Sequence, residues 1–237
     1  MPDDSAVPGR PDRGAEDPRE GAHHGEHLAQ QAGHPGWWMS QDARVTPRYF
    51  KLTDDVTLPG RWELGTPVDA QGQDHGSWLF MQGTPARVEG TLRVPSYARG
   101  RALDFSLADA GAVPVVSQRV AEVLSRLAPR DVELFPVALD DTPDPYLLVN
   151  VVRVMKCIDD TASGEVRYWM PEDGRPERVG TYQAVHRLRI DPARAGDAKV
   201  FRTWGWLIAL IVSEDIKLAL EAIGATGVQF KDVSPLR

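Results

Sequence analysis

Three residues have side chains that could together form a catalytic set: Cys157, Asp159 and His186. A thiolate nucleophile needs a neighbouring base, and that base needs an acid to orient it. The chain has one cysteine, and His186 lies on the apolar side of the alternating segment 182–190. We therefore predict that His186 is packed in the core and that Cys157 is a small buried hydrophobic residue. An enzyme of unrecognised type that uses Cys157 and His186 is kept as the alternative.

The sequence indicates no metal or cofactor site. Four of the six histidines lie within residues 1–36, where no rigid scaffold or carboxylate-rich surroundings would support a metal. Asp159 and Asp160 precede Ser163-Gly164, but this segment has too few ligands for a calcium loop and indicates a turn. The glycine-rich phosphate and dinucleotide motifs, the zinc-protease motif and the serine-hydrolase motif do not occur. We therefore expect no catalytic, cofactor-binding or metal-binding residues.

The tryptophans are the other residues that could carry function, because aromatic side chains are enriched at protein interfaces. The chain has seven of them. Trp204 and Trp206 lie in an apolar run and are predicted to pack in the core. Trp62 follows Arg61 in a Pro-Gly-Arg-Trp turn, and we predict that Arg61 and Trp62 contact a partner.

Composition and charge narrow the class of protein. The chain has 237 residues, 26% of them charged and 42% hydrophobic, as is ordinary for a soluble globular protein. Its net charge of −7 does not suit binding of nucleic acid through a basic face. One cysteine excludes an intramolecular disulfide. With neither a signal peptide nor an apolar run long enough to span a membrane, a cytoplasmic protein is expected.

A change of composition before Trp37 divides the chain. Residues 1–36 contain no aromatic residue and hold more than half of the net negative charge. Such a segment cannot bury enough apolar surface to fold, so a disordered tail is predicted. Residues 37–110 are predicted to be β-rich and residues 111–237 to be α+β, although 37–237 could form one continuous domain.

Periodicity predicts an α+β fold with a mixed, largely antiparallel sheet. Helical spacing of apolar residues predicts amphipathic helices over about 117–127 and 214–223, with Ser117 as the cap of the first. Strands are expected at the following segments: 49–52, 77–81, 132–139, 146–158, 182–190 and from 228. The run 146–158 is apolar on both faces and indicates a central strand.

The two helices and the strands after them match each other at one constant offset. Val116-Ser117 falls on Val212-Ser213, Leu124 on Leu220, and Val132 on Val228. This pattern is compatible with an internal duplication of a helix-strand unit, and equally with two independent capped helices that each precede a strand.

Several short segments, in their order along the chain, carry a family resemblance. They are Pro59-Gly60-Arg61-Trp62 with Gly65 and Pro67, Leu103-Asp104-Phe105-Ser106, Pro114-Val115-Val116-Ser117, Val137, Tyr146, Asn150-Val151, Cys157-Ile158-Asp159, Phe201-Arg202, Val212-Ser213-Glu214, Glu221, Thr226-Gly227-Val228 and Phe230. From about Tyr49 to Val233 the chain resembles the myxobacterial-type immunity-protein family of bacterial polymorphic toxin systems.

The resemblance implies neutralisation of a cognate toxin, the toxin domain of a secreted effector, by direct stoichiometric binding. It supplies no active residues. A chain without a catalytic cluster fits such a binder, and it also fits a scaffold or regulatory binding module, which stays open beside the enzyme alternative.

Overall fold

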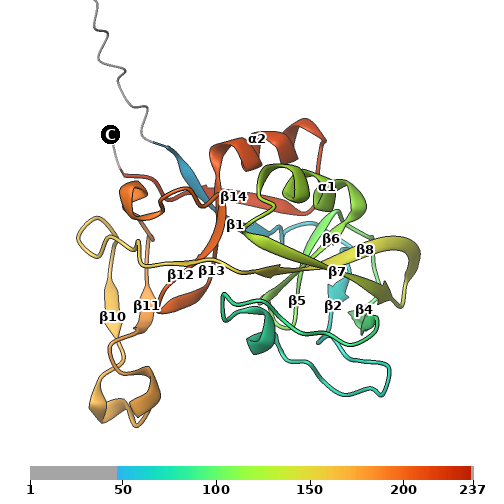
Figure 1. The fold of residues 1–237 in the computed structure, drawn as a ribbon, viewed down its shortest axis with the longest axis horizontal. Helices are drawn as coiled ribbons and strands as arrows, with labels where there is room; N and C mark the ends of the chain where they lie inside the picture. Colours follow the sequence, from blue (N-terminus) through green and yellow to red (C-terminus); the bar gives the residue numbers. More distant parts are fainter. Residues whose placement is uncertain (1–46, 236–237) are drawn as a thin grey trace, which may run out of the picture. The chain divides into compact units, whose positions relative to one another are not determined.

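The computed structural model describes residues 47–235, which belong to one compact unit, Val45–Arg237. The predicted disordered tail, residues 1–36, lies outside the described residues. The described residues of this unit form two five-stranded sheets, two α-helices and two small two-stranded sheets (Figure 1). The predicted α+β class with mixed, largely antiparallel sheets is therefore confirmed.

The first large sheet is built around the β7–β8 hairpin. Its strands, in spatial order, are β3 (Leu92–Val94), β7 (Val132–Leu139), β8 (Thr142–Val151), β6 (Val113–Ser117) and β5 (Phe105–Ala108). Only the β3–β7 pair among these is parallel. The central place of β8 explains why both of its faces are apolar.

The second large sheet combines the first strand of the described chain with the last. Its order is β14 (Val228–Asp232), β1 (Tyr49–Asp54), β13 (Trp206–Ser213), β12 (Val200–Thr203) and β9 (Val154–Met155). The β12–β9 pair is parallel, and the other pairs are antiparallel. The segment 146–158, predicted to be one extended strand, is therefore divided between the two sheets. Its first part belongs to β8, which ends at Val151, and its second part contains β9, which pairs with β12.

Helices α1 (Gln118–Leu127) and α2 (Glu214–Ala222) confirm the two predicted helices and lie against each other (Figure 1). Ser117 and Ser213 occupy the N-cap positions, but neither side chain accepts a hydrogen bond from its helix. The hydroxyl of Ser117 instead donates to Asp104 Oδ1 at 2.8 Å, and that of Ser213 donates to Asp215. Ser117 therefore stands at the predicted N-cap position, but its hydroxyl forms a hydrogen bond with Asp104 and not with a backbone N–H of the helix.

The two helix-strand units have the same topology. In the first sheet the neighbours run β5-β6-β8-β7, with α1 between β6 and β7; in the second they run β12-β13-β1-β14, with α2 between β13 and β14. The strand β1, from the start of the described chain, fills the place of β8. The two units that match in sequence therefore also match in the arrangement of their strands.

Alternation of side chains along the strands creates three hydrophobic clusters. The central cluster lies between the two large sheets and the helices, and it includes Phe50, Val116, Leu124, Leu210 and Leu220. The opposite face of the first sheet forms a second cluster with the segment that precedes it in the chain. The opposite face of the second sheet forms a third, around buried Cys157 and Phe201.

The smaller elements complete the fold on its periphery. Short strands β2 (Glu63–Leu64) and β4 (Ser96–Ala98) form one pair, and β10 (Val166–Tyr168) and β11 (Tyr182–Val185) form another. The 3-10 helices are η1 (Ser77–Phe80), η2 (Pro171–Asp173), η3 (Pro176–Arg178) and η4 (Pro192–Arg194). The loop that joins β10 to β11 contains η2 and η3, and all its residues from 171 to 180 are exposed.

Two strand predictions are wrong. Residues 77–81 form η1 because Leu79 N–H donates to the Gly76 carbonyl and Met81 N–H to the Trp78 carbonyl, which curls the backbone. The predicted strand 182–190 ends at Val185, since Arg187 has a positive φ of 47° and cannot continue an extended strand.

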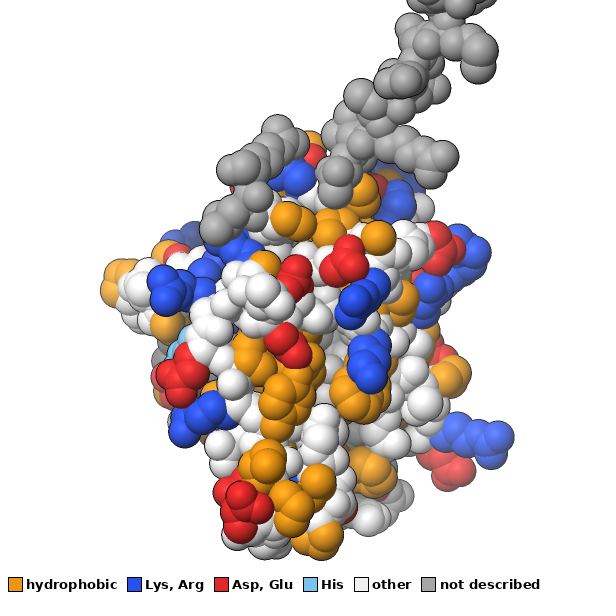
Figure 2. All heavy atoms as spheres, turned by 90° about the vertical axis from the view of Figure 1, so that its left-hand side faces the viewer, with side chains coloured by type: hydrophobic (Ala, Val, Ile, Leu, Met, Phe, Trp, Pro, Cys, Tyr) orange, Lys and Arg blue, Asp and Glu red, His pale blue; other side chains and the backbone are white. Residues whose placement is uncertain are grey.

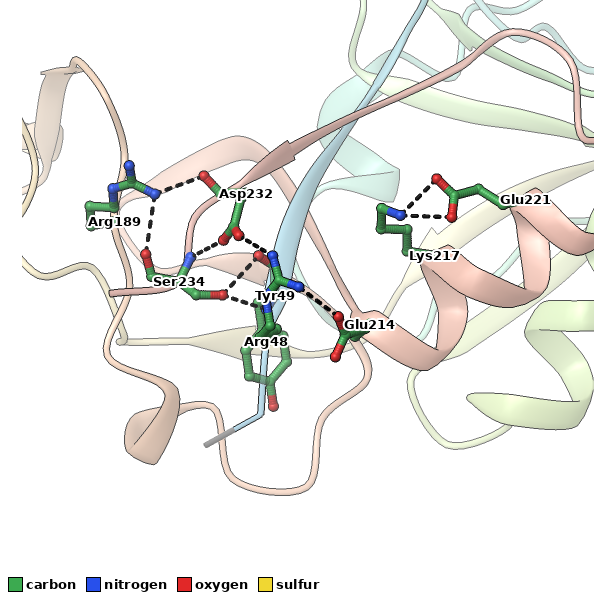
Figure 3. A network of polar contacts seen from close by, with 8 residues as sticks. All are labelled: Arg48, Tyr49, Arg189, Glu214, Lys217, Glu221, Asp232 and Ser234. Atoms are coloured by element: carbon green, nitrogen blue, oxygen red, sulfur yellow. Dashed lines mark hydrogen bonds and ion pairs between the residues drawn. The ribbon is translucent and has the colours of Figure 1, made fainter. Parts of the chain in front are cut away.

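A polar network joins the start of β1 to α2 and to the end of β14 (Figure 3). Arg48 donates to Glu214 at 2.9 Å and to Asp232 at 2.6 Å. The Ser234 hydroxyl accepts from the first backbone N–H of β1, and Arg189 donates to the carbonyls of Asp232 and Ser234. These contacts hold the edge strand β14 onto β1, where main-chain pairing alone would leave it prone to fraying.

Candidate partner-binding surface

The residues of the enzyme alternative do not form a reactive pair. Cys157 is completely buried, and this burial raises the pKa of its thiol to about 12, so it is a neutral thiol at physiological pH. The prediction that Cys157 is a buried hydrophobic residue is confirmed. His186 is exposed, and the prediction that it packs in the core is wrong. The strand ends one residue before His186, so the alternation that would have buried it does not reach it.

The Asp159 carboxylate is used within a local turn. Asp159 Oδ1 accepts the backbone N–H groups of Thr161 at 3.0 Å and Ala162 at 2.9 Å, which confirms the predicted turn. Within residues 47–235, no group of three or more His, Cys, Asp or Glu side chains is arranged to hold a metal ion. The four histidines of the tail lie outside the described residues.

Trp62 lies in the core, with 1% of its surface exposed. Its Nε1–H donates to the Ser106 hydroxyl at 2.7 Å, and its ring packs edge-on against Tyr146 at 5.3 Å between centroids. Arg61 is half-buried and pairs with Asp54 at 3.2 Å. The structure thus gives Trp62 a packing role, and contact of this turn with a partner stays a prediction.

A groove on the face that carries β10 and β11 is the strongest candidate for a binding surface. It has a volume of about 620 Å³. We call it the aromatic groove, and its main lining residues are Met81, Val154, Trp169, Arg178, Tyr182, Trp204, Trp206 and Ile208. In Figure 2, hydrophobic side chains gather over this part of the face, with charged side chains beside them. Trp204 is 39% exposed and Ile208 is 42% exposed.

The prediction that Trp204 packs in the core is wrong, and the turn between β12 and β13 is the reason. Gly205, with φ at +74°, reverses the chain directly after Trp204. A Cβ at Gly205 would lie 3.0 Å from the Tyr182 ring, so glycine is required there by conformation and by space. Trp204 N–H donates to the Met155 carbonyl at 2.9 Å, which places its side chain at the tip of the hairpin.

The opposite side of the groove is formed by the exposed loop between β10 and β11. Trp169 N–H donates to the Thr181 carbonyl at 2.9 Å, and Gly180 N–H donates back to the Trp169 carbonyl at 3.2 Å. The Arg178 guanidinium lies over the Trp169 ring, 5.4 Å from its centroid. These contacts order the loop so that its tryptophan faces the groove without full burial.

Tyr182 is held in the groove by Asp160. Its hydroxyl donates to Asp160 Oδ1 at 2.8 Å, and the hydroxyl of Tyr168 donates to Oδ2 of the same carboxylate. The two tyrosine rings lie 4.8 Å apart. Burial, followed by the hydrogen bonds, raises the pKa of Tyr182 far above its usual value. Both rings therefore stay neutral and serve as packing surface.

The buried Arg202 side chain holds the backbone beneath the groove in place through hydrogen bonds. Its side chain is 1% exposed, and it donates to the Leu207 carbonyl in β13 and to the Ala112 carbonyl beside the first sheet, both at 2.8 Å. No carboxylate among the described residues pairs with it, and its Nε–H has no hydrogen-bond partner there. Burial lowers the pKa of Arg202 to about 10, so the side chain stays charged. Arg202 therefore fixes the strand that carries Trp206 and Ile208 against the other sheet.

Two cations stack on indole rings at the groove, and the lining also contains one acid, Glu177. Lys156 Nζ lies 4.5 Å above the Trp204 ring centroid, and Arg178 covers Trp169 as described above. Lys156 and Trp204 lie in segments that are far apart in the chain, so no local pattern in the sequence predicts their contact. The tryptophan-glycine-tryptophan spacing of residues 204–206 is the one local signal that could have revealed an exposed hairpin tip.

An exposed tryptophan with two half-buried ones beside it, next to stacked cations, is typical of surfaces that bind other proteins. The chain matches the family model described as Immunity protein family (Imm11) over residues 34–235, and it belongs to this family of immunity proteins. No curated protein matches the chain. Within the part of the chain that the structure describes, the helices are all too short or too polar to cross a membrane.

Proposed function

We propose that this protein neutralises a cognate toxin by binding it directly in a stoichiometric complex, and that the aromatic groove is the contact surface. The partner would be the toxin domain of a secreted effector, met in the cytoplasm. Membership of the immunity-protein family supports the first part of this proposal. The exposure of Trp204 beside Trp169, Trp206 and Tyr182 supports the second.

The residues of the aromatic groove are of the types that give an inhibitor high affinity for its target. Protection of a cell requires tight binding, and nanomolar affinity corresponds to about −12 kcal/mol. Stable interfaces bury about 1,600 Å² in total and depend on a few central tryptophan, tyrosine or arginine residues. The aromatic groove offers all three residue types in one place, whereas Cys157 and His186 offer no activated nucleophile.

A titration of toxin activity tests the mode of action. A toxin domain found encoded beside the gene for this protein would be mixed with increasing amounts of the full chain, and the remaining toxin activity would be measured. We expect inhibition to be complete at a fixed molar ratio. Progressive inactivation by far less than one equivalent would show turnover and would refute the stoichiometric mechanism.

Two tryptophan variants test the surface. Trp204→Ala removes an indole from the groove, and Trp78→Ala removes an indole that is 70% exposed but does not line it. We expect Trp204→Ala to weaken toxin binding by at least about tenfold, as for an interface hot spot. Trp78→Ala should bind like the wild type, and equal effects of both changes would argue against the groove.

A further inference from the structure

Lys156 is an exposed cation that stacks on Trp204, a lining residue of the aromatic groove, and it forms no salt bridge with an acid within residues 47–235. It is held in place by the Trp204 ring, 4.5 Å below its Nζ. Arg167 on β10, by contrast, lies 3.3 Å from Glu165. Lys156 differs from Arg167 in that its close contact is an indole ring and not a carboxylate.

A partner that covers the Trp204 ring also covers the Lys156 ammonium group stacked on it. A partner that packs against the indole removes water from the ammonium group, and a buried ammonium without an acceptor is strongly unfavourable. The partner must therefore supply an acceptor, and a carboxylate is the strongest one that a protein offers.

Arg178, on the opposite side of the groove, also needs an acceptor from a partner that covers it. Its nearest acid is Glu177, whose Oε1 lies 3.9 Å from Arg178 Nε, and both side chains are more than half exposed. Such a contact is weak in water. The remaining donors of the guanidinium are free to bind a carboxylate through two hydrogen bonds, as arginine does at many interfaces.

We propose that the aromatic groove binds an acidic segment of the toxin, in which one carboxylate pairs with Lys156 and another with Arg178 while an apolar side chain packs on Trp204. This inference rests on the proposed function. The chain as a whole has a net charge of −7, so its long-range field does not attract an acidic partner. Recognition must then come from these two cations at short range.

Three substitutions at one position test the pairing of Lys156. Lys156→Met keeps the length of the side chain without its charge, Lys156→Arg keeps the charge, and Lys156→Glu reverses it. Affinity for the neighbouring-gene toxin domain is measured by calorimetry with the full chain. We expect a loss of at least about tenfold for Lys156→Met, a larger loss for Lys156→Glu, and near-wild-type affinity for Lys156→Arg.

Lys231→Met is the matched control, because Lys231 is an exposed lysine on β14, a strand that contributes no residue to the groove. It should bind like the wild type. Raising the salt concentration should also weaken the wild type more than Lys156→Met. Equal affinity of Lys156→Met and the wild type, or equal salt dependence, would overturn the inference and leave stoichiometric inhibition intact.

Sedimentation of each variant separates toxin binding from self-association. If Lys156→Met changes the oligomeric state of the chain alone, the groove binds a second copy and the inference is overturned. If the wild-type chain fails to bind or inhibit the toxin domain, the proposed function fails, and this inference fails with it.

Discussion

Tyr49 lies directly opposite Ser213 in the pairing of β1 with β13, and Tyr146 lies opposite Ser117 in the same way in the pairing of β8 with β6. Each serine stands at the N-cap of a helix. Each tyrosine hydroxyl donates to a carbonyl two residues before a strand, at Ala198 before β12 and at Leu103 before β5. The two sheets therefore share their register as well as their topology, and β1 is a structural equivalent of β8.

This equivalence predicts where truncation becomes harmful. Removal of residues 1–36, which the sequence predicts to be a disordered tail, should leave the melting temperature unchanged. Removal of residues 1–54 deletes β1, whose Phe50 and Leu52 belong to the central cluster, and should abolish cooperative unfolding. Differential scanning calorimetry of both truncations checks this. A lower melting temperature for the shorter truncation would show that the tail contributes to stability.

The leucines at the centre of the two helices should contribute similarly to stability. Leu124 is 5% exposed and Leu220 is fully buried, and both belong to the central cluster. Leu→Ala at either position should lower the free energy of unfolding by about 2–5 kcal/mol. Leu218 in α2 is 54% exposed and serves as the control, with an expected change below about 0.5 kcal/mol. Urea melts that rank Leu218→Ala with the other two would contradict this core.

Asp104 should make stability depend on pH. Burial by itself would raise the pKa of Asp104, but hydrogen bonds from the backbone and hydroxyl of Thr226 and from Ser117 outweigh it, and the pKa is lowered. A lowered folded-state pKa stabilises the protein above the unfolded value of about 4, and this contribution disappears as pH falls through the folded-state pKa.

We therefore expect Asp104→Asn to lower the free energy of unfolding by about 1–3 kcal/mol at pH 7, and the difference from wild type to shrink below pH 4. Urea melts at pH 7 and pH 3 measure this. Glu89→Gln, a change at an exposed acid, should stay within about 0.5 kcal/mol of wild type at both pH values. A difference for Asp104→Asn that is the same at both pH values would exclude the ionic contribution.

The thiol and the imidazole should be dispensable for protection. Cys157 is buried, with its thiol pKa raised to about 12, so a thiol reagent should label it only after unfolding. Cys157→Ala and His186→Gln should both protect cells that express the toxin domain. A folded Cys157→Ala variant that loses protection would favour the enzyme alternative.

The Arg61-Trp62 turn allows a test of the partner contact that the sequence predicts. Trp62→Phe removes the hydrogen bond to Ser106 and should lower the free energy of unfolding by about 1–3 kcal/mol. Arg61→Ala should weaken toxin binding by about tenfold if the turn contacts the partner. Affinity measured well below the melting temperature separates the two effects, and unchanged affinity for Arg61→Ala would restrict the turn to a structural role.

Local pattern in the sequence was sufficient to predict the two helices and β7. The apolar stripes around Leu124 and Leu220 predict helices because a helix repeats its faces within four residues, so the signal is local. The match between the two helix-strand units is also visible in short stretches of sequence. The apolar residues next to Cys157 are likewise sufficient to assign its side chain to the core.

Tertiary structure alone decided which aromatic residues are exposed. The sequence predicts a partner contact for Trp62, whose ring is buried against Ser106 and Tyr146, and it predicts a core position for Trp204, which stands at a hairpin tip supported by Met155 and Tyr182. Lys156 stacks on Trp204, and Arg178 lines the same groove, only because the segment after β9, the β10–β11 loop and the β12–β13 turn converge. Burial depends on what packs from distant parts of the chain, and a tryptophan contains the same apolar ring whether that surface is covered or open to a partner.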